Sequence, residues 1–179
     1  MTRNILFAGL LLLGFTACNK EVDELPAATQ TGANTFGAKV NGEYWVPARF
    51  GILPADDLLD ARFNSPGSLL ITAKNFSASP KETQFEIQIV GVDGVGTYLM
   101  NKSVPVRPSA DPFAYYIKRV LTPEDEWITD PTYTGSVTLT KLDTHNRIVS
   151  GTFEFRAGSI SGSGNVLTVT DGRFDIKYH

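Results

Sequence analysis

The sequence predicts an all-β domain, and three observations support this fold class. Apolar and polar residues alternate with a period of two in several short runs, most clearly at residues 149–156 and 173–178. Turn-forming pairs such as Asn41-Gly42 and Asp93-Gly94 separate these runs, and helical signals are few. Because such alternation gives a strand one buried and one wet face, we expect a single antiparallel β-sandwich or flattened β-barrel over residues 35–179.

The expected strands lie, in order, at residues 36–40, 43–46, 84–89, 96–99, 113–120, 137–140, 149–156, 167–169 and 173–178. Asn41-Gly42 gives the strongest hairpin signal, because both central residues of its turn must accept a positive φ. Residues 101–112, which contain three prolines, are predicted to form a long loop, and residues 143–146 a hairpin turn. Asp171-Gly172 separate the last two runs, and Gly151 inside a strand suggests a bulge or a close backbone approach.

Two short segments carry helical signals. Residues 56–62 can form one or two turns. Residues 122–126 begin with a threonine suited to cap a helix, followed by a proline at the first helical position and by acids in the first turn. Helix breakers flank both segments, and so we expect little helix in the domain.

Residues 1–17 are predicted to be a lipoprotein signal peptide, and Cys18, the single cysteine of the chain, its lipid anchor. The uncharged apolar run at residues 5–15 is shorter than the roughly 20 residues of a membrane-spanning helix. Phe15-Thr16-Ala17-Cys18 resembles the lipobox of bacterial lipoproteins, although that family usually has Leu at the position of Phe15. The resemblance implies that Cys18 gains a thioether-linked diacylglycerol and becomes the acylated N terminus after cleavage. The alternative is an incidental cysteine beside an ordinary cleavage site.

Charged residues follow the cysteine at positions 20–24. They are similar to the acidic export tags of Bacteroidetes surface lipoproteins, and a solvated spacer is the alternative. Asn19 is not the Asp associated with inner-membrane retention, so the resemblance implies a lipid-anchored outer-membrane protein on the cell surface or the periplasmic face.

Residues 18–34 are predicted to be the lipidated cysteine followed by a flexible tether, because they contain almost no large apolar side chain. A disordered tether of this kind averages roughly 20 Å in length. The leader holds one basic residue and no acid, so the formal net charge of −3 becomes −4 without it. This mild acidity argues against nucleic acid as a partner.

Four segments of the domain carry a second resemblance. They are residues 38–45, 133–143, 148–155 and 170–176, which include the patterns TGSVTLTKLD, IVSGTFEF and TDGRFDI. Together they resemble an uncharacterised family of Bacteroidetes lipoproteins with a β-sandwich-like domain and no established activity. Members of that family often have Cys where this chain has Ala38.

The sequence contains no recognisable catalytic, metal or cofactor motif, and so we expect no cofactor. His145 lies in a predicted turn and His179 at an end that we expect to fray, which leaves too few ligands for zinc. Two acidic groups lack the ligand order of a calcium loop and are interpreted as solvated, with calcium binding as the alternative. They are Asp56, Asp57 and Asp60, and Glu124, Asp125, Glu126 and Asp130. Paired carboxylates for glycoside cleavage stay open, because their separation is spatial.

Aromatic residues are the remaining candidates for ligand binding: Trp45, Tyr116, Trp127 and Tyr133. Strand parity places Trp45 and Tyr116 opposite the expected buried faces, where flat rings could stack on sugars. Packing in the core is the favoured interpretation, since large aromatic side chains are usually buried.

The anchor, the tether and the lack of catalytic motifs together predict a non-catalytic binding or interaction module rather than an enzyme. Its expected partners are the membrane, through the Cys18 lipid, and a glycan or envelope protein. Two alternatives are a hydrolase acting on envelope or dietary polysaccharide, and a purely structural envelope lipoprotein.

Overall fold

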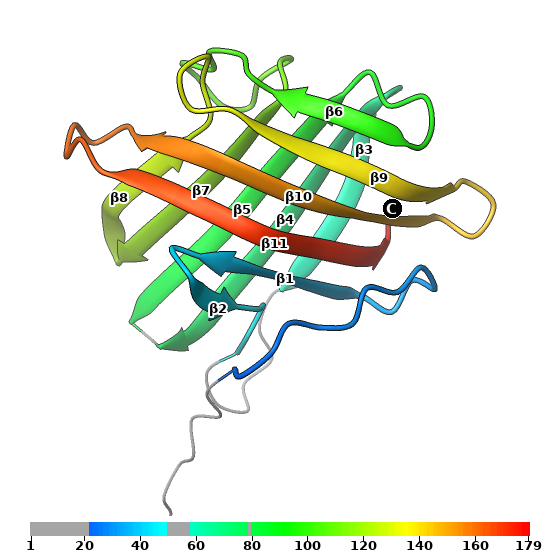
Figure 1. Ribbon diagram of the computed structural model, residues 1–179, viewed down its shortest axis with the longest axis horizontal. Coiled ribbons are helices and arrows are strands. Elements are labelled where there is room, and N and C mark those ends of the chain that lie inside the picture. The colour runs from blue at the N-terminus through cyan, green and yellow to red at the C-terminus, as the bar shows by residue number, and fades with distance from the viewer. Residues whose placement is uncertain (1–21, 50–57, 79) are drawn as a thin grey trace, which may run out of the picture.

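The computed structural model describes residues 22–49, 58–78 and 80–179 (Figure 1). The strands are β1 (Thr35–Val40), β2 (Glu43–Trp45), β3 (Leu59–Ser65), β4 (Ser68–Ala78), β5 (Lys81–Val90), β6 (Gly96–Met100), β7 (Phe113–Val120), β8 (Thr122–Ile128), β9 (Gly135–Asp143), β10 (Ile148–Ser159) and β11 (Val166–Lys177). The described residues form no helix, so the all-β prediction is confirmed. Nor does this part of the chain hold any helix of the length and apolarity that crossing a bilayer requires. The predicted leader and Cys18 lie outside the described residues.

All these strands belong to one antiparallel sheet that folds over on itself into two layers (Figure 1). The front sheet consists of β6, β9, β10, β11, β1 and β2, and the back sheet of β8, β7, β5, β4 and β3. The ladder passes from one layer to the other through two residue pairs of β8 and β10: Ile128 with Gly158 and Trp127 with Ser159. The sheet is not closed into a barrel, so the sandwich-like alternative describes the fold.

The C terminus lies on the side of the sandwich opposite the β8–β10 crossing (Figure 1). There the backbone N–H of His179 donates to the carbonyl oxygen of Ala61 on β3, at 2.9 Å. The expectation that His179 frays was therefore wrong, because β11 carries the C terminus to the edge of the back sheet.

Aromatic side chains fill the space between the sheets. Phe85, on β5, is fully buried, and its ring centroid lies 4.7 Å from that of Trp45 and 4.8 Å from that of Tyr116. Phe36 lies 5.5 Å from the same ring and Phe153 6.1 Å. Phe85 therefore contacts rings from both layers, and edge-to-face pairs of this kind stabilise a core beyond the area that they bury.

A second, smaller apolar cluster lies on the outer face of the back sheet. The loop between β6 and β7 covers this face, and its Val104 packs with Phe113, Tyr115 and Ile117 of β7. Tyr116 points the other way, into the space between the sheets. The prediction that Tyr116 lies on an exposed face was wrong, because β7 is covered on both sides.

Two other expectations were corrected. Residues 122–126 belong to β8 rather than to a helical turn, because Leu121 at φ 65° closes a tight hairpin with β7. Pro123 fits a strand here because β8 pairs with β10 only at its far end, at Trp127 and Ile128. The edge of β8 beside Pro123 has no partner strand among the described residues, so the missing N–H of the proline is not needed there. In the other helical candidate, residues 59–62 lie in β3, and residues 56 and 57 lie outside the described residues.

Most of the local turn predictions hold, and the one at Asp171-Gly172 does not. Asn41 and Gly42 have φ values of 50° and 91° and close the β1–β2 hairpin. Residues 101–112 form the predicted loop, and His145 lies in the turn between β9 and β10. Asp171, at φ 54°, begins a bulge inside the continuous strand β11 instead of ending a strand.

The structure gives residues 29–34 a fixed position, in contrast to the predicted disorder of the tether. The buried carboxylate of Asp175, which is 1% exposed, accepts hydrogen bonds from the Thr29 hydroxyl at 2.6 Å and from the backbone N–H of Gly32 at 2.8 Å. It also accepts from the N–H groups of Thr31 and Ala33. We call residues 25–34 the strap, because they lie against the outer face of the front sheet.

Gly151 confirms the predicted close approach. A Cβ at this position would lie 2.4 Å from the backbone oxygen of Thr138 and 2.8 Å from the ring of Phe174. We expect Gly151→Ala to lower the free energy of unfolding by about 1–3 kcal/mol, because β9 or Phe174 must move. Urea unfolding of both variants measures this, with Gly94→Ala as the control, since no atom lies within 4 Å of its Cβ position. Equal stabilities of the two variants would contradict the close approach of β9 to β10.

The hydrogen bonds to Asp175 make a pH dependence predictable. Burial alone would raise the pKa of Asp175, but the donors of Thr29, Ala33, Ser150 and Thr31 outweigh it and hold the pKa far below its usual range. The stabilisation is therefore complete above about pH 4, the ordinary pKa of aspartate, and is lost as the pH falls toward the lower folded-state value.

We expect Asp175→Asn to lower the free energy of unfolding at pH 7 by about 2 kcal/mol or more, because buried donors lose a charged acceptor. The same variant should lose less stability than the parent protein when the pH is lowered from 5 to 3. Denaturant unfolding at a series of pH values tests both expectations. Asp93→Asn, at an exposed position, is the control. An unchanged acid dependence in Asp175→Asn would contradict this role.

Candidate functional site

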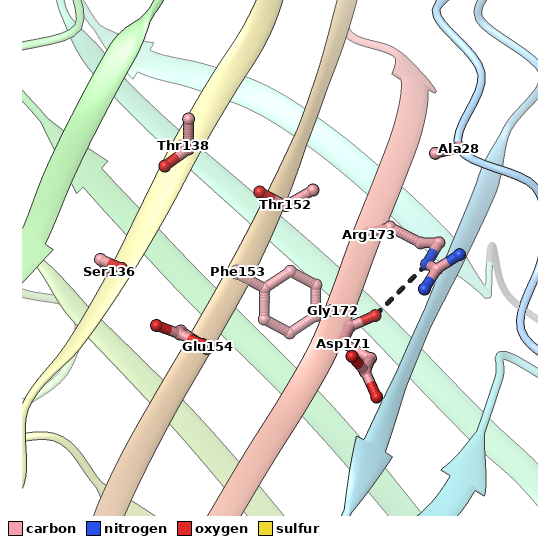
Figure 2. A pocket seen from close by; sticks show the side chains of 9 residues that line it. All are labelled: Ala28, Ser136, Thr138, Thr152, Phe153, Glu154, Asp171, Gly172 and Arg173. Atoms are coloured by element: carbon pink, nitrogen blue, oxygen red, sulfur yellow. Dashed lines mark hydrogen bonds between the residues drawn. The ribbon is translucent and has the colours of Figure 1, made fainter.

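The outer face of the front sheet carries an open groove, seen from close by in Figure 2. It begins as a hollow of about 500 Å³ across β9, β10 and β11. The side chains of Thr138, Thr152, Glu154 and Arg173 line it, and Ala28 of the strap closes one side. A second hollow of about 410 Å³ shares Ser136 and Glu154 with the first, so the two form one continuous groove.

Strand alternation explains why polar residues gather there. Phe153 and Phe155 of β10 point into the core, which turns Thr152, Glu154 and Arg156 outward. The neighbouring strands follow the same rule, and their outward residues include Ser136, Thr138, Thr168 and Thr170. The site could not be predicted from the sequence, because the alternation of polar residues alone does not say which strands are neighbours in the sheet.

The charged groups of the groove differ in how they are held. Asp171 forms an ion pair with Lys39 at 2.9 Å, and this hydrogen bond lowers the pKa of Asp171. Arg173 donates weakly to backbone oxygens of Asp171 and Pro26, at 3.3 Å and 3.5 Å. Among the ion pairs between described residues, none includes Glu154, Arg156 or Arg173.

This chemistry suits a ligand rich in hydrogen-bonding groups. Serine and threonine hydroxyls both donate and accept, a carboxylate accepts, and a guanidinium donates in a fixed fork. Such a set can bind hydroxyl and carboxylate groups along an extended molecule.

The four aromatic candidates lie in different places. Trp45 and Tyr116 are 7% and 6% exposed and face the core, so the platform interpretation was wrong for them. For Trp45 the reason is register: it pairs with inward-facing Ala38, and its indole N–H donates to the Thr83 hydroxyl at 2.8 Å.

Trp127 and Tyr133 are half-buried. Trp127 packs against Tyr116, with ring centroids 5.9 Å apart, and its buried indole N–H has no partner among the described residues. Tyr133 lies over Gly158, and the Arg156 guanidinium is 5.6 Å from its ring centroid. Tyr133 is thus the one of the four that adjoins the groove, beyond Arg156.

The acidic residues of β8 point to different partners. Asp125 accepts from the hydroxyls of Ser159, Ser161 and Ser163 at 2.5–3.0 Å, which ties the glycine-serine loop to β8. Glu124 pairs with Lys118 at 3.0 Å. Within the described ranges, no three His, Cys, Asp or Glu side chains lie close enough together to hold a metal ion. Asp56 and Asp57 of the other acidic group lie outside those ranges.

The back sheet also carries a charged cluster that the sequence did not predict. Arg107, from the loop before β7, lies 3.2 Å from the ring centroid of Tyr115 and pairs with Glu86 at 2.8 Å and Glu126 at 3.4 Å. Burial and the hydrogen bond to Glu126 raise the pKa of Tyr115. The two carboxylates, one on β5 and one on β8, share one arginine, an arrangement that fixes the loop over the back sheet.

Comparisons with known proteins place the chain in a family. A search of curated proteins and a search of solved structures each give no match. A family described as a domain of unknown function, DUF6252, matches residues 33–175, which take in β1 to β10 and all of β11 except its last two residues. The chain belongs to this DUF6252 family.

Proposed function

We propose that the protein is a lipid-anchored outer-membrane lipoprotein whose domain is a non-catalytic binding module for a glycan or another envelope component. The leader and Cys18 support the anchor, and the resemblance to Bacteroidetes lipoproteins supports the outer membrane. The observation that carries the binding role is the groove across β9, β10 and β11.

The groove suits binding because two of its charged side chains project outward and are not held in ion pairs with other described residues. Glu154 and Arg156 project from one rigid strand, and the ion pairs of the described residues do not include them. Sites on strands hold side chains more accurately than sites on loops, so a ligand meets donors and acceptors that are already in position.

A glycan is the ligand class that fits this surface best. Sugar hydroxyls can donate to Glu154 and exchange hydrogen bonds with Thr138 and Thr152. Tyr133, next to Arg156, gives a half-buried ring near one end of the groove, where a sugar face can stack. The open groove also accepts an extended chain.

The anchor is tested by Cys18→Ser expressed in a lipoprotein-processing host. We expect the variant to leave the membrane fraction and to lose the acyl chains, because serine gives no thioether. Carbonate extraction and mass spectrometry of the intact protein measure both. Membrane retention of Cys18→Ser would argue against the lipid anchor.

The groove is tested by Thr152→Val with Glu154→Gln. These changes remove one hydroxyl and one charge while keeping side-chain size. We expect binding to a glycan found by array screening to weaken at least about tenfold, since a lost charged hydrogen bond amounts to about 1.5–3 kcal/mol. Isothermal titration calorimetry measures this, with Glu43→Gln on β2 as the control. If the double variant binds the glycan as tightly as Glu43→Gln does, the binding site lies elsewhere on the domain.

A further inference from the structure

The strap determines how far the domain can stand from its anchor. Leu25 and Pro26 pack over Gly37 of β1 so closely that a Cβ on Gly37 would lie 2.7 Å from the Pro26 ring. Further along, the Lys141 ammonium donates to the backbone oxygen of Gln30 at 2.9 Å. These contacts and those to Asp175 hold the strap from its first residue to its last.

The last contact of the strap is made by Asn34. Its side-chain oxygen accepts from the backbone N–H of Lys177 at 2.9 Å, directly before the chain enters β1. The strap is therefore bound at both ends and in the middle, and it behaves as part of the front sheet.

Chain length then limits the separation from the membrane. Leu25 lies seven positions after Cys18, and a fully extended chain over seven steps spans at most about 25 Å. If the whole segment to Thr35 were free, the limit would be about 60 Å. The bound strap thus removes more than half of the possible reach.

The point where the strap begins selects one side of the sandwich. In Figure 1 the described chain begins below β2, at the β1–β2 edge of the front sheet, and then runs along β1. Tyr44 on β2 is 43% exposed at this edge. Tyrosine is enriched where proteins meet lipid head groups, because its ring is apolar and its hydroxyl is polar.

We infer that the strap holds the β1–β2 edge of the domain against the head groups of the anchoring bilayer, with β6 directed away from it. This inference rests on the lipid anchor of the proposed function. In this orientation the β1–β2 edge faces the lipid, and the groove lies on the side of the domain rather than beneath the domain.

The orientation can be measured because Cys18 is the only cysteine and is blocked by lipid in the anchored protein. An engineered cysteine then takes a fluorophore at one position. Glu43→Cys on β2, which keeps Tyr44, and Leu99→Cys on β6 place the label at exposed positions on opposite edges of the front sheet. Five strand spacings separate β2 from β6, which is about 24 Å.

The lipidated proteins are reconstituted in vesicles of phosphatidylethanolamine and phosphatidylglycerol that carry a head-group acceptor dye. We expect energy transfer from the label at residue 43 to be at least twice that from the label at residue 99. In an Asp175→Ala background the difference should shrink, whereas Asp93→Ala should leave it unchanged. Equal transfer from the two positions in the parent background would overturn the inference.

A second pair of measurements separates the strap from the anchor. In the soluble Cys18→Ser protein, the amide hydrogens of Thr31, Gly32 and Ala33 should exchange slowly, since Asp175 accepts from all three. Rapid exchange there would overturn the inference and leave the lipid anchor intact. Failure of the parent protein to float with vesicles would instead refute the anchor.

Asp175→Ala exposes a buried site and can unfold the domain. A variant in which Gly-Ser repeats of equal length replace residues 25–31 therefore serves as the second test. It keeps β11 intact and should likewise reduce the difference in energy transfer between residues 43 and 99. A difference that persists in this folded variant would overturn the role of the strap.

Discussion

The arrangement of the two sheets depends on the aromatic contact around Phe85. The strand ladder passes between the layers through two residue pairs of β8 and β10, so the alignment of the layers elsewhere rests mainly on side-chain packing. Phe85 supplies it by touching Trp45, Tyr116 and Phe153 from both layers. Truncating such a ring costs about 3–5 kcal/mol, a large part of the stability of a small domain.

The same packing produces the polar groove. Once Phe153 and Phe155 point into the core, the residues between them must face outward along β10. The strap adds the remaining side, because its bond to Asp175 places Ala28 beside the groove. The groove on the outer face thus depends on a core contact and on one buried carboxylate.

Local patterns in the sequence predicted those features of the fold that depend on local backbone geometry. Asn41-Gly42 indicated the hairpin, and the close contact at Gly151 was visible from a glycine inside an alternating run. Burial of Tyr116 was not predictable, because the loop that covers the opposite face of β7 is distant in sequence. The groove and the Asp175 site join segments separated by up to 147 residues, and no local period reports such pairings.

The outer edge of β8 has a consequence for how copies of the protein behave when they are crowded together. Residues 122–124 expose a strand edge that β10 does not reach, and an open edge invites pairing with another molecule. Pro123 cannot donate a backbone hydrogen bond there, and Glu124 is exposed beside it. Proline and charge together make this edge a poor template, so copies of the protein can remain separate molecules even at high local concentration.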